Sequence, residues 1–432
     1  MFYAKYPLAV SLAAFAFTQH ALAADTSAAP ECAQYEKLLT RAELAFKNVP
    51  ICARIKPDLW GLRKELAEHG IGFTATSYNG YTYDVLGNNA KKQVYNGQNP
   101  SYNTSLNLYL TYDLTRVGFA NDAQLTLAGN WVDSTYTPAN PRVKTVSVFA
   151  INQSFFNHQL ELEYGFIPGV RLFYGMALGG SASTAALGPS SVVPFQVGMS
   201  ATEPTPTVNV IVRDPSLRFY NSTALTRSVS PEGIQKDVDL NPSGLRLKVP
   251  DARAMLINEF GYKQAPSASS NAMWLRAGAM YNTSHYTEFT TGEKSDNNYG
   301  VYLAETVQVT KPYGDARGWY LDSKLDYSPD SVNAINKAFQ VSAFNVGPFA
   351  SRPADMAAVG LTKSYYSKDL RDVTRSYGME AAPYTLAVTA SYAARLIPGV
   401  YLISGLTYTK NPVFTPIHSD ALLLQESLNF LF

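Results

Sequence analysis

The stretch from Tyr102 to Leu114 alternates between two kinds of side chain. Its even positions are apolar or aromatic, with Thr104 as the one exception, and its odd positions are mostly polar, as in Asn103, Ser105 and Asn107. A period of two indicates a β-strand, because successive side chains leave a pleated chain on opposite sides. An apolar face and a polar face together are typical of a transmembrane β-barrel, which has lipid outside and water inside. A half-buried strand of a soluble β-sandwich has the same pattern, so this strand alone leaves both open.

Tyr102 and Tyr112 lie ten positions apart on the apolar face. At ~3.3 Å per residue they are about 33 Å apart, and a tilt of roughly 45° reduces this to a height of about 23 Å. That height is close to the lipid-facing band of a barrel. We therefore predict that Leu106, Leu108 and Leu110 face lipid and that the two tyrosines belong to aromatic girdles at its edges.

The first residues have the form of a secretory signal peptide. Lys5 precedes a mostly apolar run from Leu8 to Phe17, and Ala21-Leu22-Ala23 fits an A-x-A cleavage site. The run is too short for a stable membrane helix, and no later segment offers about 18 unbroken apolar residues. We expect residues 1–23 to be removed on export. The mature chain is then either a soluble secreted protein or an outer-membrane barrel.

Composition favours one large barrel over several domains. Hydrophobic residues make up 46% of the chain and charged residues only 16%, and the 29 tyrosines suit interfacial belts. No charged block or low-complexity linker divides the mature part. A formal net charge of +1 argues against nucleic acid as a partner.

Long and short links between the candidate strands alternate along the chain. Residues 84–100 and 133–144 are long polar links, whereas residues 115–122 are a short one, and residues 410–420 form a long link before the last candidate strand. Barrels show this pattern because their periplasmic turns are short and their extracellular loops long. Counted backwards from a last strand at 421–432 that ends in the periplasm, the C-terminal links alternate in the same way, with the long links on the extracellular side. Both ends therefore fit one even-stranded antiparallel barrel.

The middle of the chain is less regular. Residues 175–207 and 213–250 are rich in Gly, Ser, Pro or Arg, and we expect them to fold into the lumen and narrow it. At roughly 22 residues per strand with its link, residues 71–432 predict about sixteen strands, a size that encloses a water-filled channel. Further candidate strands are 123–132, 160–166, 255–262, 273–281, 299–309, 319–327 and 400–408.

The segment before the first strand is predicted to be helical and periplasmic. Apolar residues recur at helical spacing over 31–49, and a second helix is expected to open at Pro57 or Asp58 and to close at Gly70. Cys32 and Cys52 would form a disulfide worth about 3 kcal/mol in an oxidising compartment, with two free thiols as the alternative. The predicted organisation is a signal peptide (1–23), an N-terminal periplasmic helical segment (24–70) and an all-β transmembrane barrel (71–432).

Motifs of catalysis or metal binding are absent from the sequence. Its five histidines are scattered and none begins H-E-x-x-H, two cysteines are too few for a Cys-rich zinc site, and there is no P-loop or G-x-S-x-G elbow. Glu161 and Glu163 share one strand face, as paired catalytic carboxylates do, but adjacent acids are also common on the wall of a pore. We favour the pore wall, and expect no enzyme activity, no metal and no cofactor.

The chain resembles the carbohydrate-selective porins of the OprB type. The resemblance is carried by the segment from Trp60 to Gly72, the strand from Leu106 to Leu114, the stretch Gly347-Pro-Phe-Ala-Ser-Arg-Pro353 and the terminal Phe432. It spans residues 59 to the end and implies a sixteen-stranded outer-membrane channel that passes mono- or oligosaccharides by diffusion. Phe432 on an alternating strand also resembles the signal read by the outer-membrane assembly machinery, and the barrel surface would contact outer-membrane lipid.

The candidate solute path starts from the strand at 273–281. An Arg in lipid is costly, so the phase that puts Arg276 in water is favoured, and that phase carries Trp274 into the lumen. An indole beside a guanidinium can stack on a sugar ring and donate to its hydroxyls. The alternative is that Trp274 belongs to a girdle and Arg276 pairs with a wall acid. The full set of pore-lining candidates is Trp274, Arg276, Glu161, Glu163, Asp322, Lys324, Arg213 and Arg218.

Passive, carbohydrate-selective diffusion is the leading functional hypothesis. A general or ion-selective porin with the same fold is the first alternative, and an outer-membrane enzyme or a secreted sugar-binding β-protein is the second. Gel migration that changes on heating separates the last from the barrels, and solute-specific liposome swelling separates the two kinds of porin.

Overall fold

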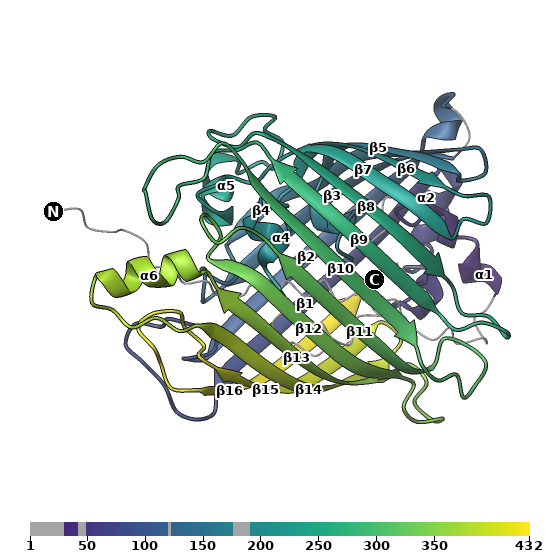
Figure 1. Ribbon diagram of the computed structural model, residues 1–432. Coiled ribbons are helices and arrows are strands. Elements are labelled where there is room, and N and C mark those ends of the chain that lie inside the picture. The colour runs from purple at the N-terminus through teal and green to yellow at the C-terminus, as the bar shows by residue number, and fades with distance from the viewer. Residues whose placement is uncertain (1–29, 42–48, 120–121, 176–190) are drawn as a thin grey trace.

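Sixteen antiparallel strands close into one barrel, in which each strand pairs with its neighbours in sequence and β1 pairs with β16 (Figure 1). The computed structural model describes residues 30–41, 49–119, 122–175 and 191–432. The expected signal peptide, residues 1–23, lies outside this range. The predicted antiparallel barrel of about sixteen strands is confirmed.

The strands run from eight to 14 residues. Their bounds are β1 (Ile71–Asp84), β2 (Ser101–Asp113), β3 (Ala123–Ser134), β4 (Val143–Phe155), β5 (Leu160–Ile167), β6 (Thr205–Arg213), β7 (Phe219–Arg227), β8 (Ala254–Gln264), β9 (Met273–Asn282), β10 (Asn298–Gln308), β11 (Gly318–Tyr327), β12 (Ile335–Val346), β13 (Met356–Tyr366), β14 (Tyr384–Ile397), β15 (Val400–Lys410) and β16 (Ala421–Leu431).

The helices of the described residues are short. They are α1 (Pro30–Ala33), η1 (Glu36–Leu38), η2 (Ile51–Ala53), α2 (Leu62–Glu68), η3 (Leu114–Val117), η4 (Gly169–Arg171), α4 (Val193–Gln196), α5 (Ile234–Leu240) and α6 (Lys368–Ser376). Among the described residues, no helix is long and apolar enough to cross a membrane.

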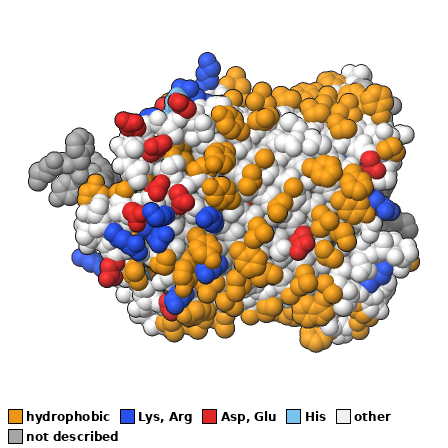
Figure 2. Space-filling model, in the orientation of Figure 1, with side chains coloured by type: hydrophobic (Ala, Val, Ile, Leu, Met, Phe, Trp, Pro, Cys, Tyr) orange, Lys and Arg blue, Asp and Glu red, His pale blue; other side chains and the backbone are white. Residues whose placement is uncertain are grey.

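The alternation in β2 sorts its side chains between two environments. Leu108 and Leu110 are each 43% exposed on the outer surface, whereas Asn107 is only 2% exposed on the inner wall. Hydrophobic side chains cover much of the outer wall, and charged side chains gather at the end that carries α6 (Figure 2). The predicted phase, with leucines outward and polar residues inward, is therefore confirmed.

The two ends of the barrel differ in their connections. At one end lie turns of two to nine residues, such as 156–159 and 398–399, and the long connections 85–100, 168–204 and 228–253 leave the other end. Short turns mark the periplasmic end of an outer-membrane barrel. The N-terminal segment with α1 and α2 lies at the end with the short turns, and α5 and α6 lie at the end with the long connections (Figure 1).

The N-terminal segment docks against the inner wall of the periplasmic mouth. The Thr111 hydroxyl of β2 donates to the Leu38 carbonyl, the Arg41 guanidinium pairs with Asp122 at 2.8 Å, and the Ile55 N–H donates to the Leu431 carbonyl at 2.8 Å. These contacts join the segment to β2, to the turn before β3 and to β16. The segment therefore covers part of the mouth.

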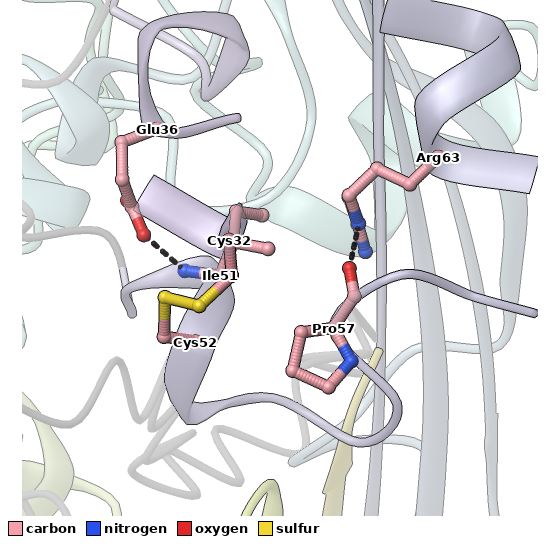
Figure 3. Close-up of a disulfide and its surroundings, with 6 residues drawn as sticks. All are labelled: Cys32, Glu36, Ile51, Cys52, Pro57 and Arg63. Atoms are coloured by element: carbon pink, nitrogen blue, oxygen red, sulfur yellow. Dashed lines mark hydrogen bonds between the residues drawn. A yellow bond between two sulfur atoms is a disulfide. The ribbon is translucent and has the colours of Figure 1, made fainter. Parts of the chain in front are cut away.

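The helix predicted over residues 31–49 is wrong for the residues described, since residues 34–41 contain only the single turn η1, and residues 42–48 lie outside the described range. Tertiary contacts override the helical spacing here. The half-buried Glu36 carboxylate accepts from the Ile51 N–H at 2.6 Å (Figure 3), and burial raises the pKa of Glu36. Leu38 and Val49 are buried against the barrel instead of along one helix.

The second predicted helix is present as α2, but it begins at Leu62 and not at Pro57 or Asp58. Leu59 and Trp60 have φ values of 50° and 58°, and Gly61 has a φ of 90°. A right-handed helix needs negative φ, so it starts only after these three residues. The Arg63 side chain donates to the Pro57 carbonyl at 2.6 Å and holds this turn against α2 (Figure 3).

Cys32 and Cys52 are joined by a disulfide across a separation of 20 residues (Figure 3). We predict that mass spectrometry of unreduced peptides finds them linked in protein recovered from the outer membrane. Cys52→Ser should weaken docking of the N-terminal segment by about 3 kcal/mol, which limited proteolysis would detect as faster cleavage before α2. A Cys32→Ser/Cys52→Ser double variant that is cleaved no faster than the unaltered protein would contradict this role.

Candidate functional site

The described parts of the connection between β5 and β6, residues 168–175 and 191–204, turn into the barrel. Leu172, Phe173 and Val197 of this connection are 0% exposed. They belong to one apolar cluster with inner-wall residues of seven strands: Tyr109, Ala128, Val148, Ala150, Ala224, Met255, Ile257, Met280 and Tyr302. The connection therefore occupies lumen space, and we refer to it as the inward loop.

The inward loop is anchored to nearly opposite sides of the barrel. The Arg171 Nη1 donates to the Tyr109 hydroxyl of β2 at 2.5 Å, and the Tyr174 hydroxyl donates to Asp326 Oδ2 of β11 at 2.7 Å. In the closed order of strands, six strands separate β2 from β11 on one side and eight on the other. The described start of the loop therefore extends across the lumen and narrows the channel.

One of the two irregular segments expected in the lumen fits this loop, and the other does not. Residues 175–207 largely coincide with the inward loop, of which residues 176–190 lie outside the described range. Residues 213–250 contain β7 and then an extracellular connection with α5. The prediction that this second segment narrows the lumen as an irregular stretch is therefore wrong.

The buried carboxylate of Glu259 connects strands of the inner wall to the inward loop. Glu259 of β8 accepts from the Tyr220 hydroxyl at 2.6 Å and from the Tyr302 hydroxyl at 2.5 Å. The Tyr174 N–H also donates to Glu259, at 3.3 Å. Trp274 Nε1 donates to the Tyr220 hydroxyl at 2.9 Å. This network connects β7, β8, β9 and β10 with the loop.

Trp274 and Arg276 of β9 lie on the inner wall beside that network. Trp274 is 2% exposed and Arg276 4%. The Arg276 guanidinium carbon is 3.7 Å from the Trp274 ring centroid, and the Lys263 ammonium is 4.1 Å from the same centroid. Arg276 Nη1 donates to the Gly175 carbonyl at 2.8 Å. Its Nε and Nη2 find no hydrogen-bond partner in the described part of the chain. Trp274 is therefore not part of an outer girdle.

Asp322 and Lys324 of β11 complete this part of the wall. The strand register places Thr306 between Trp274 and Asp322, and Ala304 between Arg276 and Lys324. Asp322 Oδ2 accepts from the Thr306 hydroxyl at 2.7 Å, and its Oδ1 is buried without a described partner. The Lys324 ammonium is 4.6 Å from the Tyr174 ring centroid. The structure thus brings Trp274, Arg276, Asp322 and Lys324 into one surface, which we term the wall patch.

The other acidic candidates and Arg213 lie elsewhere on the inner wall. Glu163 is fully buried on β5 and accepts from Asn152 at 3.2 Å and Asn209 at 2.8 Å. Glu161 pairs with Arg213 at 3.0 Å, where β5 and β6 reach the periplasmic end. Glu163 thus binds two amides and Glu161 binds Arg213, and all three groups are three or more strands from the wall patch.

Arg218 does not line the pore. It is an exposed residue of the tight turn between β6 and β7, where its N–H donates to Asp214 at 2.9 Å. The sequence-based assignment of Arg213 and Arg218 to a long irregular segment is wrong, because Arg213 ends β6 and Arg218 lies in that turn. Proline and arginine between the two strands obscured a short hairpin.

Sequence analysis missed Tyr174, Tyr220, Glu259 and Tyr302. A cross-strand signal for two of them exists in the register: Gly261 opposes Tyr220, and Gly278 lies opposite Tyr302. A Cβ on Gly261 or Gly278 would lie 2.2 Å or 2.1 Å from the Cζ of the facing ring. Each glycine therefore gives a tyrosine ring room to lie over the neighbouring strand. Among the described residues, no cluster of His, Cys, Asp and Glu could hold a metal ion.

A closed barrel with an apolar outer band, a polar inner wall and a loop folded across its lumen defines a diffusion porin of the outer membrane. The carbohydrate-selective porin family OprB matches residues 138–430, more than half of the chain. The chain belongs to this family. It is a carbohydrate-selective porin that passes sugars by passive diffusion, and proteins of this family and fold are channels, not enzymes.

Solved structures agree with the fold. The chain is similar to the high-pH structure of Pseudomonas putida OprB, with a TM-score of 0.72 and 17% identity over 87% of this chain and 97% of that one. The low-pH structure of the same protein gives a TM-score of 0.56 and 14% identity, covering 88% and 98%. Salmonella typhi OmpF in complex with daunomycin gives 0.53 and 8%, covering 84% and 99%. No curated protein sequence matches the chain.

Proposed function

We propose that sugars cross this porin along the wall patch, in the part of the lumen narrowed by Tyr174 and the inward loop. The proposal rests on one observation: hydrogen-bond donors and an acceptor of the wall patch have no described partner. Arg276 Nε and Nη2 and Asp322 Oδ1 are buried without described partners on β9 and β11, the two strands that flank β10. A buried polar atom without a partner is costly, so a passing group that both donates and accepts is favoured there. Sugar hydroxyls do both.

The residues of the wall patch have different proposed roles. The Trp274 ring already has two cations near it, so we assign it the task of positioning Arg276 rather than stacking on the solute. Arg276 donates to sugar hydroxyls, and Asp322 accepts from them. Lys324 beside Tyr174 is the further donor on the loop side. Contacts of this kind must stay weak and numerous so that the solute leaves again.

The balance of charge supports an uncharged solute over an ion. Arg276 and Lys324 are cationic, whereas Asp322, Asp326 and Glu259 are carboxylates of the same wall. Rings of a single charge sign are typical of ion-selective pores. The mixed wall therefore favours sugar passage over the alternative of an ion-selective porin.

We further propose the route by which the chain reaches its membrane. Residues 1–23 act as a cleaved signal peptide, and the C-terminal strand with Phe432 is the element presented to the outer-membrane assembly machinery. Residues 24–70 then remain at the periplasmic mouth, and residues 71–432 form the lipid-embedded barrel. The docking of residues 30–41 and 49–61 against the mouth supports this division.

Arg276→Ala and Trp274→Ala, made separately, should weaken block of the ion current by sugar about tenfold. The reason is that a hydrogen bond to a charged group is worth about 1.5 kcal/mol, and Trp274→Ala removes the surface that holds Arg276. Planar-bilayer recordings with added sugar, together with liposome swelling, measure the effect. Leu275→Ala is the matched control, because Leu275 lies between the two on the outer face. Unchanged sugar block in both variants, in barrels that still migrate as folded on a gel, would remove the wall patch from the path.

A further inference from the structure

Three outward-facing lysines lie close together at the extracellular end of neighbouring strands. They are Lys337 on β12, Lys363 on β13 and Lys410 on β15. In the register, Lys363 pairs with Leu386 of β14, and Leu386 pairs with Lys410. Lys337 pairs with Tyr365, two residues from Lys363. At ~4.8 Å per strand, Lys363 and Lys410 flank a surface about 10 Å wide. We call these three residues the lysine patch.

The positive charge of the lysine patch is not neutralised within the protein. In the part of the chain that the structure describes, none of the three forms an ion pair with a carboxylate. The Lys363 ammonium lies over two tyrosine rings, 4.4 Å from the Tyr384 centroid and 4.9 Å from that of Tyr365. Rings at the edge of the lipid band place these ammonium groups at headgroup depth.

Two acidic neighbours of the lysine patch, Asp372 and Asp420, bind other groups. On α6, Asp372 pairs with Lys368 at 2.9 Å and with Arg375 at 3.9 Å. Asp420 accepts from the Tyr408 hydroxyl, on the same face of β15 as Lys410. Charged side chains of both signs gather at the end of the molecule that carries α6 (Figure 2). The lysine patch is therefore left with an unmatched positive charge facing the membrane surface.

The outward-facing lysines of the strands are all at one end of the barrel. Besides the lysine patch, the described strands have one more, Lys144, which lies at the extracellular end of β4 with its ammonium 5.0 Å from the Trp131 centroid. At the periplasmic end, Lys311 belongs to a turn and donates to the carbonyls of Ser267, Ala268 and Ser270. Lysines that only anchor a barrel at the membrane interfaces would be expected at both ends. The asymmetry points to a component of the outer leaflet.

We propose that the lysine patch binds the phosphate groups of a phosphorylated glycolipid of the lipid A type in the outer leaflet. Ammonium and phosphate form charge-assisted hydrogen bonds, and lysine provides the point charge that such sites use. Below the patch, toward the middle of the membrane, the outer faces of the same strands are apolar. Phe339, Val359, Val388 and Leu406 are each between 38% and 53% exposed there. The acyl chains lie along this surface while the phosphates contact the lysines.

The test is native mass spectrometry of the detergent-purified porin with lipid A that has two phosphates. A Lys337→Gln/Lys363→Gln/Lys410→Gln variant should retain at least tenfold less of this lipid than the unaltered protein. The matched control is Lys91→Gln/Lys92→Gln/Lys248→Gln, which removes the same charge from exposed residues of two extracellular connections and should retain the lipid normally. Replacing the three patch lysines by arginine should also preserve retention. If the triple glutamine variant fails to fold, Lys363→Gln alone is read in the same way.

Two further probes decide what is recognised. Lipid A stripped of its phosphates and phosphatidylglycerol should both be retained much less than the phosphorylated lipid A. The proposal is overturned if the triple glutamine variant retains phosphorylated lipid A as well as the unaltered protein does, or if either of the other two lipids is retained equally. Sugar flux should be the same in all variants, because the lysine patch faces away from the lumen.

Discussion

Leu108→Arg should impair insertion of the barrel or lower its free energy of unfolding by about 2–4 kcal/mol, the cost of an arginine facing the bilayer midplane. Leu108 is on the outer face near the middle of β2, and it is 43% exposed to the surroundings that lipid fills. Denaturant unfolding in liposomes measures the free energy, and the fraction of protein that migrates as a folded barrel without heating measures insertion.

Asn107→Arg is the control, because it makes a similar change one residue away on the inner wall. There the guanidinium reaches the aqueous lumen instead of lipid, and we expect a clearly smaller loss of stability. Equal damage from the two substitutions, or normal insertion of Leu108→Arg, would show that the two faces of β2 have been assigned the wrong way round.

The strands that sequence analysis found are those with one apolar and one polar face. In β11, outward Leu321 and Leu325 alternate with inward Asp322 and Lys324, and the structure keeps that phase. The alternation of link lengths was equally informative, because it depends on where chain ends and turns can lie and not on any single side chain. Parity from both ends predicted an even number of strands, and the length of residues 71–432 predicted about sixteen, although several strands were not recognised.

Strands β6, β7, β12, β13 and β14 were not recognised. In β7 and β12 the faces are not sorted in this way. The inward Phe344 of β12 stacks on Tyr320, with centroids 4.9 Å apart and planes 4° from parallel. On β7 the outward Asn221 and Thr223 are polar, and both hydrogen-bond with Asn258 of β8. An aromatic pair on the inner face and an amide network on the outer face are both stable where they lie. Both interrupt the alternation of apolar and polar residues along the strand.

Some residues of the site could be predicted from the sequence and others could not. Arg276 could be predicted to face the lumen because an arginine in lipid is costly, and Trp274 followed from the same phase. Glu259 and Tyr174 could not, because their contact joins positions 85 residues apart through the fold of the inward loop. The wall beneath that loop is also apolar on both faces: Ile257 points inward from β8 while Leu256 points outward. No local pattern encodes a loop that covers such a wall.

Phe173→Ala should release the inward loop from the wall and produce the largest change in conduction. Phe173 is fully buried in the cluster that attaches the loop to the barrel. Removing a buried phenyl ring typically costs about 3–5 kcal/mol, which falls here on the docking of the loop because the hydrogen-bonded barrel can persist without it. We expect single-channel conductance in planar bilayers to rise and block by sugar to weaken, since the wall patch then faces a wider lumen.

Phe195→Ala is the matched control on the returning limb of the same loop, where the ring is only partly buried at the edge of the cluster. It removes a similar volume but less packing, so conductance and sugar block should change much less. Folded migration on an unheated gel should be retained by both variants, because neither residue contributes to the strand pairing. If Phe173→Ala conducts and discriminates like the unaltered porin, selectivity must arise from the barrel wall without the loop, and the contact between Tyr174 and Asp326 would have no part in it.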